Sequence, residues 1–253
     1  MSSPFIIWTM RRTGGTTLTG LLMGLSERPK VEHEPFNRDR AFGWVPEQWR
    51  ETHDRQALGI AMSRALRNRP LIKHCYELAA APINSALLEA ACRESYCHIV
   101  LDRRAEVDRI LSLELAKITG AWGPKQAAER YSRFESGEAQ AASINIAAAL
   151  KHMAKCQQNR KNLDTLFKRA GVTPYVVYFE DLYSNPDSGR AEVGKLLDFI
   201  GLDPAAIPDY EQRLTNALLH KGQNSARMME CIPNIDEARS RLQEAFEHYD
   251  FRF

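Results

Sequence analysis

Residues 6–18 read Ile-Ile-Trp-Thr-Met-Arg-Arg-Thr-Gly-Gly-Thr-Thr-Leu, and this stretch changes character twice. An apolar run ends in a basic, Gly- and Thr-rich segment, after which apolar residues resume at helical spacing. We interpret this order as a strand, an anion-binding loop and the start of a helix. Backbone N–H groups in the first turn of a helix have no partner within the helix, and the helix dipole adds positive charge there. The stretch therefore predicts a site for a phosphate or sulfate group.

The side chains of this loop strengthen the prediction. Guanidinium groups bind oxyanions through forked hydrogen bonds, and hydroxyl groups can add single bonds. The loop is not a Walker A sequence, because it lacks the Lys before the final hydroxyl residue, and basic charge comes ahead of the glycines instead. An ordinary strand-to-helix turn has similar glycines, so a second motif has to decide. The residues assigned to the anion are Arg11, Arg12, Thr13, Gly14, Gly15, Thr16 and Thr17.

A second strand-to-helix junction follows at residues 99–118. The apolar run 99–101 leads into Asp102, Arg103 and Arg104, and apolar residues then recur at helical spacing. Ser112 comes roughly two helical turns after Arg104. One ligand group can touch both residues if the helix folds back beside the strand end, as helices do in open α/β sheets.

Short apolar segments alternate with helical patterns along the chain. This alternation predicts an α/β, P-loop-like three-layer fold, in which a central parallel sheet is flanked by helices and ligands bind at the carboxyl ends of the strands. Strands are expected at residues 4–10, 70–75, 97–101 and 174–178. Helices are expected at residues 16–25, 82–94, 106–118, 144–170 and 189–200.

The remaining segments are expected to be mostly irregular. Residues 34–56 and 120–140 lack clear periodicity and are interpreted as long surface loops, which are often binding elements. Residues 203–253 are interpreted as a polar C-terminal segment with one helix at 236–248. We expect residues 1–253 to form a single domain, with the segment 203–253 packing on it.

Composition indicates an ordinary soluble enzyme. The 253 residues are 44% hydrophobic and carry a formal net charge of +2, which argues against general nucleic-acid binding. No run approaches the length of a membrane span. The five cysteines are odd in number and lack a Cys-x-x-Cys pair, so neither a disulfide framework nor a metal site is predicted. We expect reduced thiols and a cytoplasmic location.

Together, the two junctions resemble those of sulfotransferases that use 3′-phosphoadenosine 5′-phosphosulfate (PAPS). Residues 12–17 resemble the family's loop for the 5′-phosphosulfate, and Arg104 with Ser112 resembles its Arg and Ser pair for the 3′-phosphate. Residues 174–202 are similar to a late strand and the helix that follows it. Within the family, the chain is most similar to bacterial carbohydrate and glycolipid sulfotransferases of the trehalose and nodulation-factor kind. It departs from them at Gly15, where a hydroxyl residue is common.

This resemblance implies in-line transfer of a sulfuryl group from PAPS, without a metal, to a hydroxyl of a carbohydrate or glycolipid. Arg12 would stabilise the charge on the bridging oxygen of the donor. The resemblance places an acidic residue near Glu34 in bacterial members and a His in other branches, so Glu34 is the expected base and His33 the alternative. A structural alternative makes Glu34 an ion-pair partner of Arg11. Lys221 and Gly222 resemble a late Lys-Gly pair that contacts the 3′-phosphate.

Three aromatic or heterocyclic side chains are secondary candidates for contact with the acceptor. His74 ends a predicted strand, although a single His there is more often a hydrogen-bonded structural residue. Trp44 and Trp49 can stack on the face of a sugar, although aromatic residues in loops commonly anchor the loop.

Two other functions remain open from the sequence. A P-loop kinase or nucleoside-triphosphatase would share the fold, but the P-loop Lys is missing, and Asp102, the nearest candidate for a magnesium ligand, is followed by two Arg residues. A non-catalytic nucleotide-binding protein would keep the fold without the chemistry. The sequence also leaves a homo-oligomer open.

Overall fold

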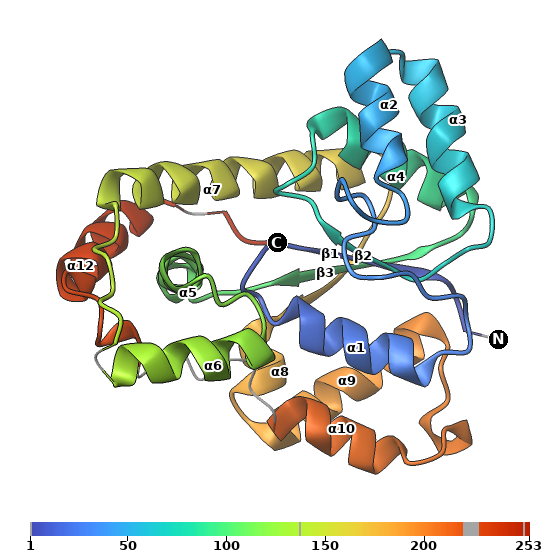
Figure 1. The fold of residues 1–253 in the computed structure, drawn as a ribbon. Coiled ribbons are helices and arrows are strands. Elements are labelled where there is room, and N and C mark those ends of the chain that lie inside the picture. The colour runs from blue at the N-terminus through green and yellow to red at the C-terminus, as the bar shows by residue number, and fades with distance from the viewer. Residues whose placement is uncertain (1, 137, 220–227, 250) are drawn as a thin grey trace. The chain divides into compact units, whose positions relative to one another are not determined.

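The structure is a computed structural model of the chain and describes residues 2–136, 138–219, 228–249 and 251–253 (Figure 1). Its contacts divide into two compact units. We call residues 1–102, 162–219 and 253 the sheet unit, and the described residues of 103–161 and 220–252 the helical unit. The expectation of a single domain stays a prediction.

The sheet unit is built on four parallel strands in the order β2-β1-β3-β4. Their register pairs Ile7 of β1 with Lys73 of β2 on one side and with Ile99 of β3 on the other. The strands are β1 (Phe5–Thr9), β2 (Ile72–Cys75), β3 (Cys97–Asp102) and β4 (Tyr175–Tyr178). The predicted α/β fold with a parallel sheet is confirmed. Because all four strands run the same way, their carboxyl ends lie at one edge of the sheet.

The central strand β1 is buried on both faces, which explains its unbroken apolar sequence. Phe5 and Ile7 belong to the apolar core that includes the buried side chains of α1 and α9. Trp8 alternates to the other face, where its ring lies edge-on to His74 and to Phe167. The strand therefore anchors two separate layers of side chains.

Helices cover both faces of this sheet (Figure 1). One set lies on the face of the apolar core and consists of α1 (Gly15–Leu25), α8 (Phe179–Tyr183), α9 (Pro186–Ile200) and α10 (Tyr210–Leu219), with the short 3-10 helix η1 (Pro204–Ala206) between α9 and α10. The other set lies on the opposite side and consists of α2 (Trp44–Thr52), α3 (Arg55–Leu66) and α4 (Ala81–Arg93).

The helical unit has its own apolar core, to which Leu111, Met153 and Leu242 contribute. Its helices are α5 (Glu106–Thr119), α6 (Pro124–Glu135), the first part of α7 (Ile146–Arg169) and α12 (Ile235–Phe246). The last residues of α7 belong to the sheet unit, so one continuous helix contributes to both units.

Three expectations for irregular segments are wrong. The segment 34–56 contains α2, and the segment 120–140 contains α6. The C-terminal segment contains η1 and α10 in addition to the expected helix. These helices bury few side chains: α2 buries only Val45, and α10 buries only Leu214 and Leu218 among the described residues. Helices with so narrow an apolar stripe give little periodic signal.

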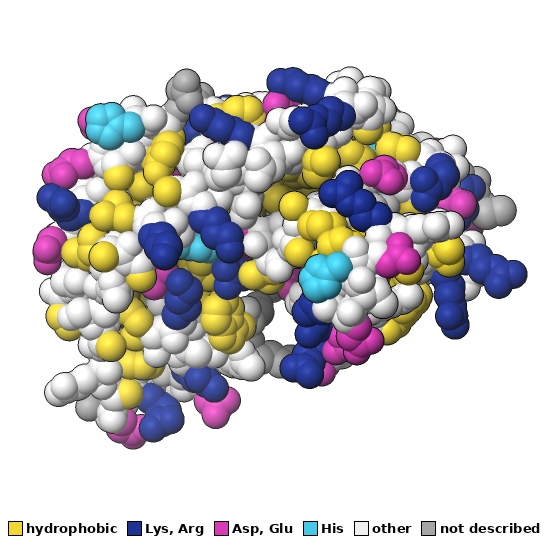
Figure 2. Space-filling model, turned by 90° about the horizontal axis from the view of Figure 1, so that it is seen from above, with side chains coloured by type: hydrophobic (Ala, Val, Ile, Leu, Met, Phe, Trp, Pro, Cys, Tyr) yellow, Lys and Arg dark blue, Asp and Glu magenta, His cyan; other side chains and the backbone are white. Residues whose placement is uncertain are grey.

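None of the helices in the described part of the chain combines the length and apolar character needed to cross a bilayer. All five cysteines are free. On the face shown in Figure 2, acidic side chains are interspersed among Lys and Arg side chains, as expected for a net charge of +2.

Candidate active site

The loop between β1 and α1 has the backbone geometry of an anion site. Gly14 adopts a left-handed conformation with φ of 79°, and α1 begins at the next residue. No side chain caps this end of the helix, and no acidic side chain lies in its first turn. An anion can therefore take the place of a cap. Arg12 is also left-handed, with φ of 69°, a strained state for a non-glycine residue that is typical of functional sites.

Gly14 is required by its neighbours as well as by its conformation. A Cβ atom at this position would lie 2.7 Å from Cε2 of Tyr183 and 2.9 Å from Cδ2 of Phe179. The Tyr183 hydroxyl also donates a hydrogen bond to the Gly14 carbonyl at 3.3 Å. The two aromatic rings thus hold the loop against the sheet unit.

Thr13 uses its hydroxyl to lock this loop from within. The side chain is fully buried and donates to the Met10 carbonyl at 2.9 Å. Its Oγ1 atom also lies 2.5 Å from that of Thr9, which hydrogen-bonds to the Leu101 carbonyl on β3. What Thr13 can offer a ligand is therefore its backbone N–H, while the hydroxyls of the exposed Thr16 and the half-buried Thr17 lie nearer solvent.

Arg11 is held by a buried acid. Its backbone N–H and its Nε both donate to Oε1 of Glu77, at 2.7 and 3.0 Å. The structural alternative that paired Arg11 with Glu34 is wrong, because Glu34 pairs elsewhere. These two bonds fix Arg11 and so orient the loop, in which Arg12 is the next residue.

Glu34 pairs with Lys73, at the end of β2. The Nζ atom of Lys73 lies 2.8 Å from Oε1 of Glu34, and Asn37 donates to Oε2 at 3.0 Å. The Glu34 backbone, left-handed with φ of 57°, also donates its N–H to the Lys73 carbonyl. Burial by itself would raise the pKa of Glu34, but the charge and hydrogen bond of Lys73, with the Asn37 bond, lower it below its ordinary value. Glu34 is therefore an anion at neutral pH.

Lys73 also contacts the anion loop. A Cβ at Gly15 would lie 3.1 Å from Cε of Lys73, so the absence of a side chain at Gly15 lets the lysine stem pass close to the first residue of α1. Lys73 is itself almost fully buried. It joins Glu34 to the loop, although it was not among the site residues predicted from the sequence. The sequence feature that could have indicated a role for Lys73 is its position next to His74, at the end of the strand predicted at residues 70–75.

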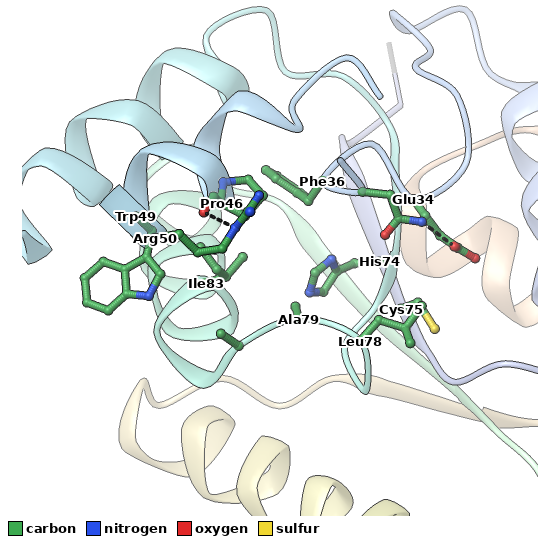
Figure 3. A pocket seen from close by; sticks show the side chains of 12 residues that line it. Glu34, Phe36, Pro46, Trp49, Arg50, His74, Cys75, Leu78, Ala79 and Ile83 are labelled. Atoms are coloured by element: carbon green, nitrogen blue, oxygen red, sulfur yellow. Dashed lines mark hydrogen bonds between the residues drawn. The ribbon is translucent and has the colours of Figure 1, made fainter. Parts of the chain in front are cut away.

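A cavity of about 210 Å³ opens beside Glu34 (Figure 3). It is smaller than the roughly 300–1,000 Å³ of sites for drug-sized ligands, so it suits a compact group such as one sugar ring. Its lining mixes polar and apolar side chains from β2, α2, α4 and the segments beside them: Glu34, Phe36, Asn37, Pro46, Trp49, Arg50, His74, Cys75, Leu78, Ala79, Ala80 and Ile83.

The two tryptophans have different surroundings. Trp49 lines the cavity, as a residue that stacks on a sugar would. Trp44 is not among the lining residues and instead lies under the guanidinium of Arg64, 5.3 Å from the ring centre, where it ties α2 to α3.

Of the two candidate bases, only Glu34 lines the cavity. His33 is half-buried, and burial together with the positive charge of Lys73 lowers its pKa, against the opposing effect of Glu34. Both groups are thus in the unprotonated form at neutral pH. Their positions relative to the cavity, and not their protonation states, distinguish Glu34 from His33 as the candidate base.

The family is decided by the central part of the chain. Residues 70–225 match the model of the Stf0 sulphotransferase family, a match that spans more than half of the 253 residues. The chain belongs to this family. The resemblance to sulfotransferases seen in the sequence is thereby confirmed. No curated protein matches the chain.

The matched region of this Stf0 sulphotransferase contains Lys73, His74, Arg104 and Ser112, whereas the anion loop and Glu34 precede it. Arg104 is exposed and Ser112 is buried on α5, and both belong to the helical unit. Their pairing on one phosphate group stays a prediction. Lys221 and Gly222 lie outside the residues that the structure describes.

Close to Arg104, the start of α5 holds a buried group of charges. Glu106 accepts from Nε of Arg109 at 2.8 Å and from Nη2 of Arg160 at 2.7 Å, and none of the three side chains is more than 2% exposed. Burial opposes ionisation of Glu106, but the two arginines lower its pKa to about 2. These residues fix the first turn of the helix that carries Ser112.

Proposed function

We propose that this sulfotransferase takes the sulfuryl group from PAPS and transfers it to a hydroxyl of a carbohydrate or glycolipid. The observation that carries the proposal is the chain of contacts from Gly15 through Lys73 to Glu34. It links an anion-binding loop to a carboxylate on the wall of a cavity, which is the pairing that sulfuryl transfer to a hydroxyl needs.

The donor binds with its phosphosulfate at the start of α1. Its oxygens accept hydrogen bonds from the backbone N–H groups of Gly15 and Thr16, in place of the missing cap. Arg12 adds a fixed positive charge. Arg104 and Ser112 hold the 3′-phosphate, and Lys221 with Gly222 contribute to the same phosphate.

The acceptor hydroxyl lies in the cavity against Glu34. Its oxygen forms a bond to sulfur while the bond from sulfur to the bridging oxygen of the donor breaks, and its proton passes to the Glu34 carboxylate. The negative charge that develops on the bridging oxygen is stabilised by Arg12 and by the loop N–H groups. The products are a sulfate ester and adenosine 3′,5′-bisphosphate. Protein residues supply each of these roles, so the scheme uses no metal.

Lys73 lies between the loop that binds the donor and the carboxylate that acts as the base. At rest it neutralises Glu34, and it faces the loop where the donor's negative charge arrives. A donor anion competes with Glu34 for the same ammonium group. Any weakening of the ion pair raises the pKa of Glu34 and makes it a stronger base at the moment when a base is needed.

Isothermal titration with adenosine 3′,5′-bisphosphate tests the donor site. We expect the wild-type protein to bind it and Arg104→Ala to lose at least tenfold in affinity, since charge-assisted hydrogen bonds are among the strongest. Arg103→Ala is the matched comparison for the neighbouring charge. Preferential binding of ATP with magnesium would contradict the proposal and point to phosphoryl transfer.

Transfer of labelled sulfate from PAPS to a panel of sugars and glycolipids then tests the reaction itself. Donor binding without transfer to any of them would favour a non-catalytic nucleotide-binding protein. The five free cysteines agree with the reducing conditions of the cytoplasm, which is where we place the reaction.

A further inference from the structure

His74 is a buried side chain with one edge at the cavity. It lies on β2 opposite Trp8 of β1, and only 2% of it is exposed. Its ring is held edge-on between Trp8, at 5.3 Å, and Phe36, at 5.6 Å. Figure 3 shows the ring projecting into the space lined by Glu34 and Trp49. Packing on two sides therefore fixes the direction in which its nitrogens point.

Asn84 fixes which nitrogen carries the hydrogen. The Asn84 amide donates through Nδ2 to the Tyr76 carbonyl at 3.1 Å, so its Oδ1 faces His74, whose Nε2 lies 2.6 Å away. Because Oδ1 can only accept, Nε2 must donate. In a neutral imidazole the other nitrogen, Nδ1, then carries a lone pair. Burial lowers the pKa of His74 to about 4, so the ring is neutral in the working range of most enzymes.

Nδ1 is therefore an acceptor with a fixed direction. It has no hydrogen-bond partner among the described residues, and the His74 side chain is part of the cavity lining, so its lone pair is available to a ligand in the cavity. Glu34 presents a second acceptor to the same cavity. Two acceptors in one small space repel a carboxylate or phosphate ligand and favour a ligand with two hydroxyl donors.

We propose that Nδ1 of His74 accepts a hydrogen bond from a second hydroxyl of the sulfate acceptor, next to the hydroxyl that Glu34 deprotonates. His74 then determines specificity: it selects polyols, such as sugars, over simple alcohols. This inference rests on the proposed function and adds to it a residue that recognises a second hydroxyl of the acceptor. A ligand without the second hydroxyl would leave a buried acceptor unpaired, which costs about tenfold to a hundredfold in kcat/KM.

Two substitutions separate this role from a structural one. In His74→Asn, a side-chain oxygen can occupy the place of Nδ1, but the bond to Asn84 is lost. In His74→Gln, the amide can keep the bond to Asn84, but nothing replaces Nδ1. If His74 recognises the second hydroxyl, His74→Asn should keep most of the wild-type preference for acceptors that carry this hydroxyl, and His74→Gln should lose it. A purely structural His74 predicts the opposite order.

The probes are methyl α-D-glucopyranoside and its monodeoxy derivatives, with labelled PAPS as donor. For the wild type we expect one deoxy derivative, other than the one that lacks the reacting hydroxyl, to lose about tenfold to a hundredfold in kcat/KM. In His74→Gln that derivative and the parent should react at similar rates. Should either variant fail to fold, the deoxy series on the wild type still tests the second hydroxyl.

The outcomes distinguish this inference from the proposed function. Wild-type protein that fails to bind adenosine 3′,5′-bisphosphate overturns both. Wild-type protein that binds it but sulfates none of the glucosides overturns the preference for a sugar and leaves the donor site standing. Transfer to the glucosides with equal deoxy effects in the wild type and in His74→Gln overturns the role of His74 alone.

Discussion

The ammonium of Lys73 lies 2.8 Å from the carboxylate of Glu34, and neither group is fully exposed to solvent. An ion pair in this setting controls the charge of its acid, because burial and the cation act on the Glu34 pKa in opposite directions. The same lysine contacts the first residue of α1, so the state of the donor site and the basicity of Glu34 are connected through one side chain.

Removing the cation should shift the pH dependence of the reaction. In the wild type the Glu34 pKa lies below its ordinary value of 4.5, so kcat/KM should stay level until the pH falls below that value. In Lys73→Met the charge and hydrogen bond of Lys73 are lost, so that only Asn37 and His33 still oppose the effect of burial, and the acidic limb should move to higher pH. The measurement is kcat/KM against pH, with the exposed Lys30→Met as control. An unmoved limb would mean that Lys73 does not set the charge of Glu34.

Glu34→Gln should abolish transfer without abolishing donor binding. Loss of a general base typically costs about 10²- to 10⁴-fold in rate, whereas affinity for adenosine 3′,5′-bisphosphate should change little, because Glu34 does not belong to the loop. Single-turnover transfer and titration calorimetry give the two readouts. His33→Asn is the comparison: a larger loss in that variant would assign the base to His33.

Gly14→Ala should weaken both the fold and the donor site. The added methyl group meets the rings of Tyr183 and Phe179 and requires a left-handed alanine, a combination that we expect to cost about 1–3 kcal/mol. Gly20→Ala, on the open side of α1 with nothing within 4 Å of the new atom, should instead stabilise the protein by about 0.5–1 kcal/mol. Urea unfolding of both variants checks the contrast, and equal effects would refute the special role of Gly14.

The buried ion pairs of Glu106 should make the stability of the helical unit depend on pH. The Glu106 pKa is lowered to about 2 in the folded protein, so the stability it contributes is complete above its ordinary value of 4.5 and is lost as the pH falls toward 2. Glu106→Gln removes the buried carboxylate that Arg109 and Arg160 share, which should cost about 3–5 kcal/mol at pH 7. Glu244→Gln, which breaks an exposed pair with Arg241, should cost less than about 1 kcal/mol. Urea titrations at neutral and acidic pH measure both.

The sequence predicted the elements that bury much apolar surface. The four strands and the helices after β1 and β3 were placed within a few residues, because period and apolar content are strong there. The helices α2, α6 and α10 were not predicted, because each buries only one or two of the side chains whose burial the structure describes. The start of α3 does have a sequence signal, because Asp54 is a favourable N-cap residue whose side chain accepts from the N–H groups of Gln56 and Ala57.

The candidate site was predicted only in part, for a physical reason. Glycines and arginines in a loop are visible in the sequence, so the anion site was proposed at once. The partners of Glu34, Arg11 and His74 depend on which strands lie side by side, and β2 is 39 residues from Glu34 at the Lys73 contact. Such pairings follow from the sheet order and not from local spacing.

The close approach of Lys73 to Gly15 also constrains how this loop can change. A hydroxyl side chain at position 15 would have to share its space with the lysine stem, 3.1 Å from the new Cβ, and with Thr9 at 3.3 Å. Gly15→Ser is therefore expected to be harmful in this background and tolerated once residue 73 is shortened. The two positions are epistatic, and a protein that gains the hydroxyl first must pass through a less fit intermediate.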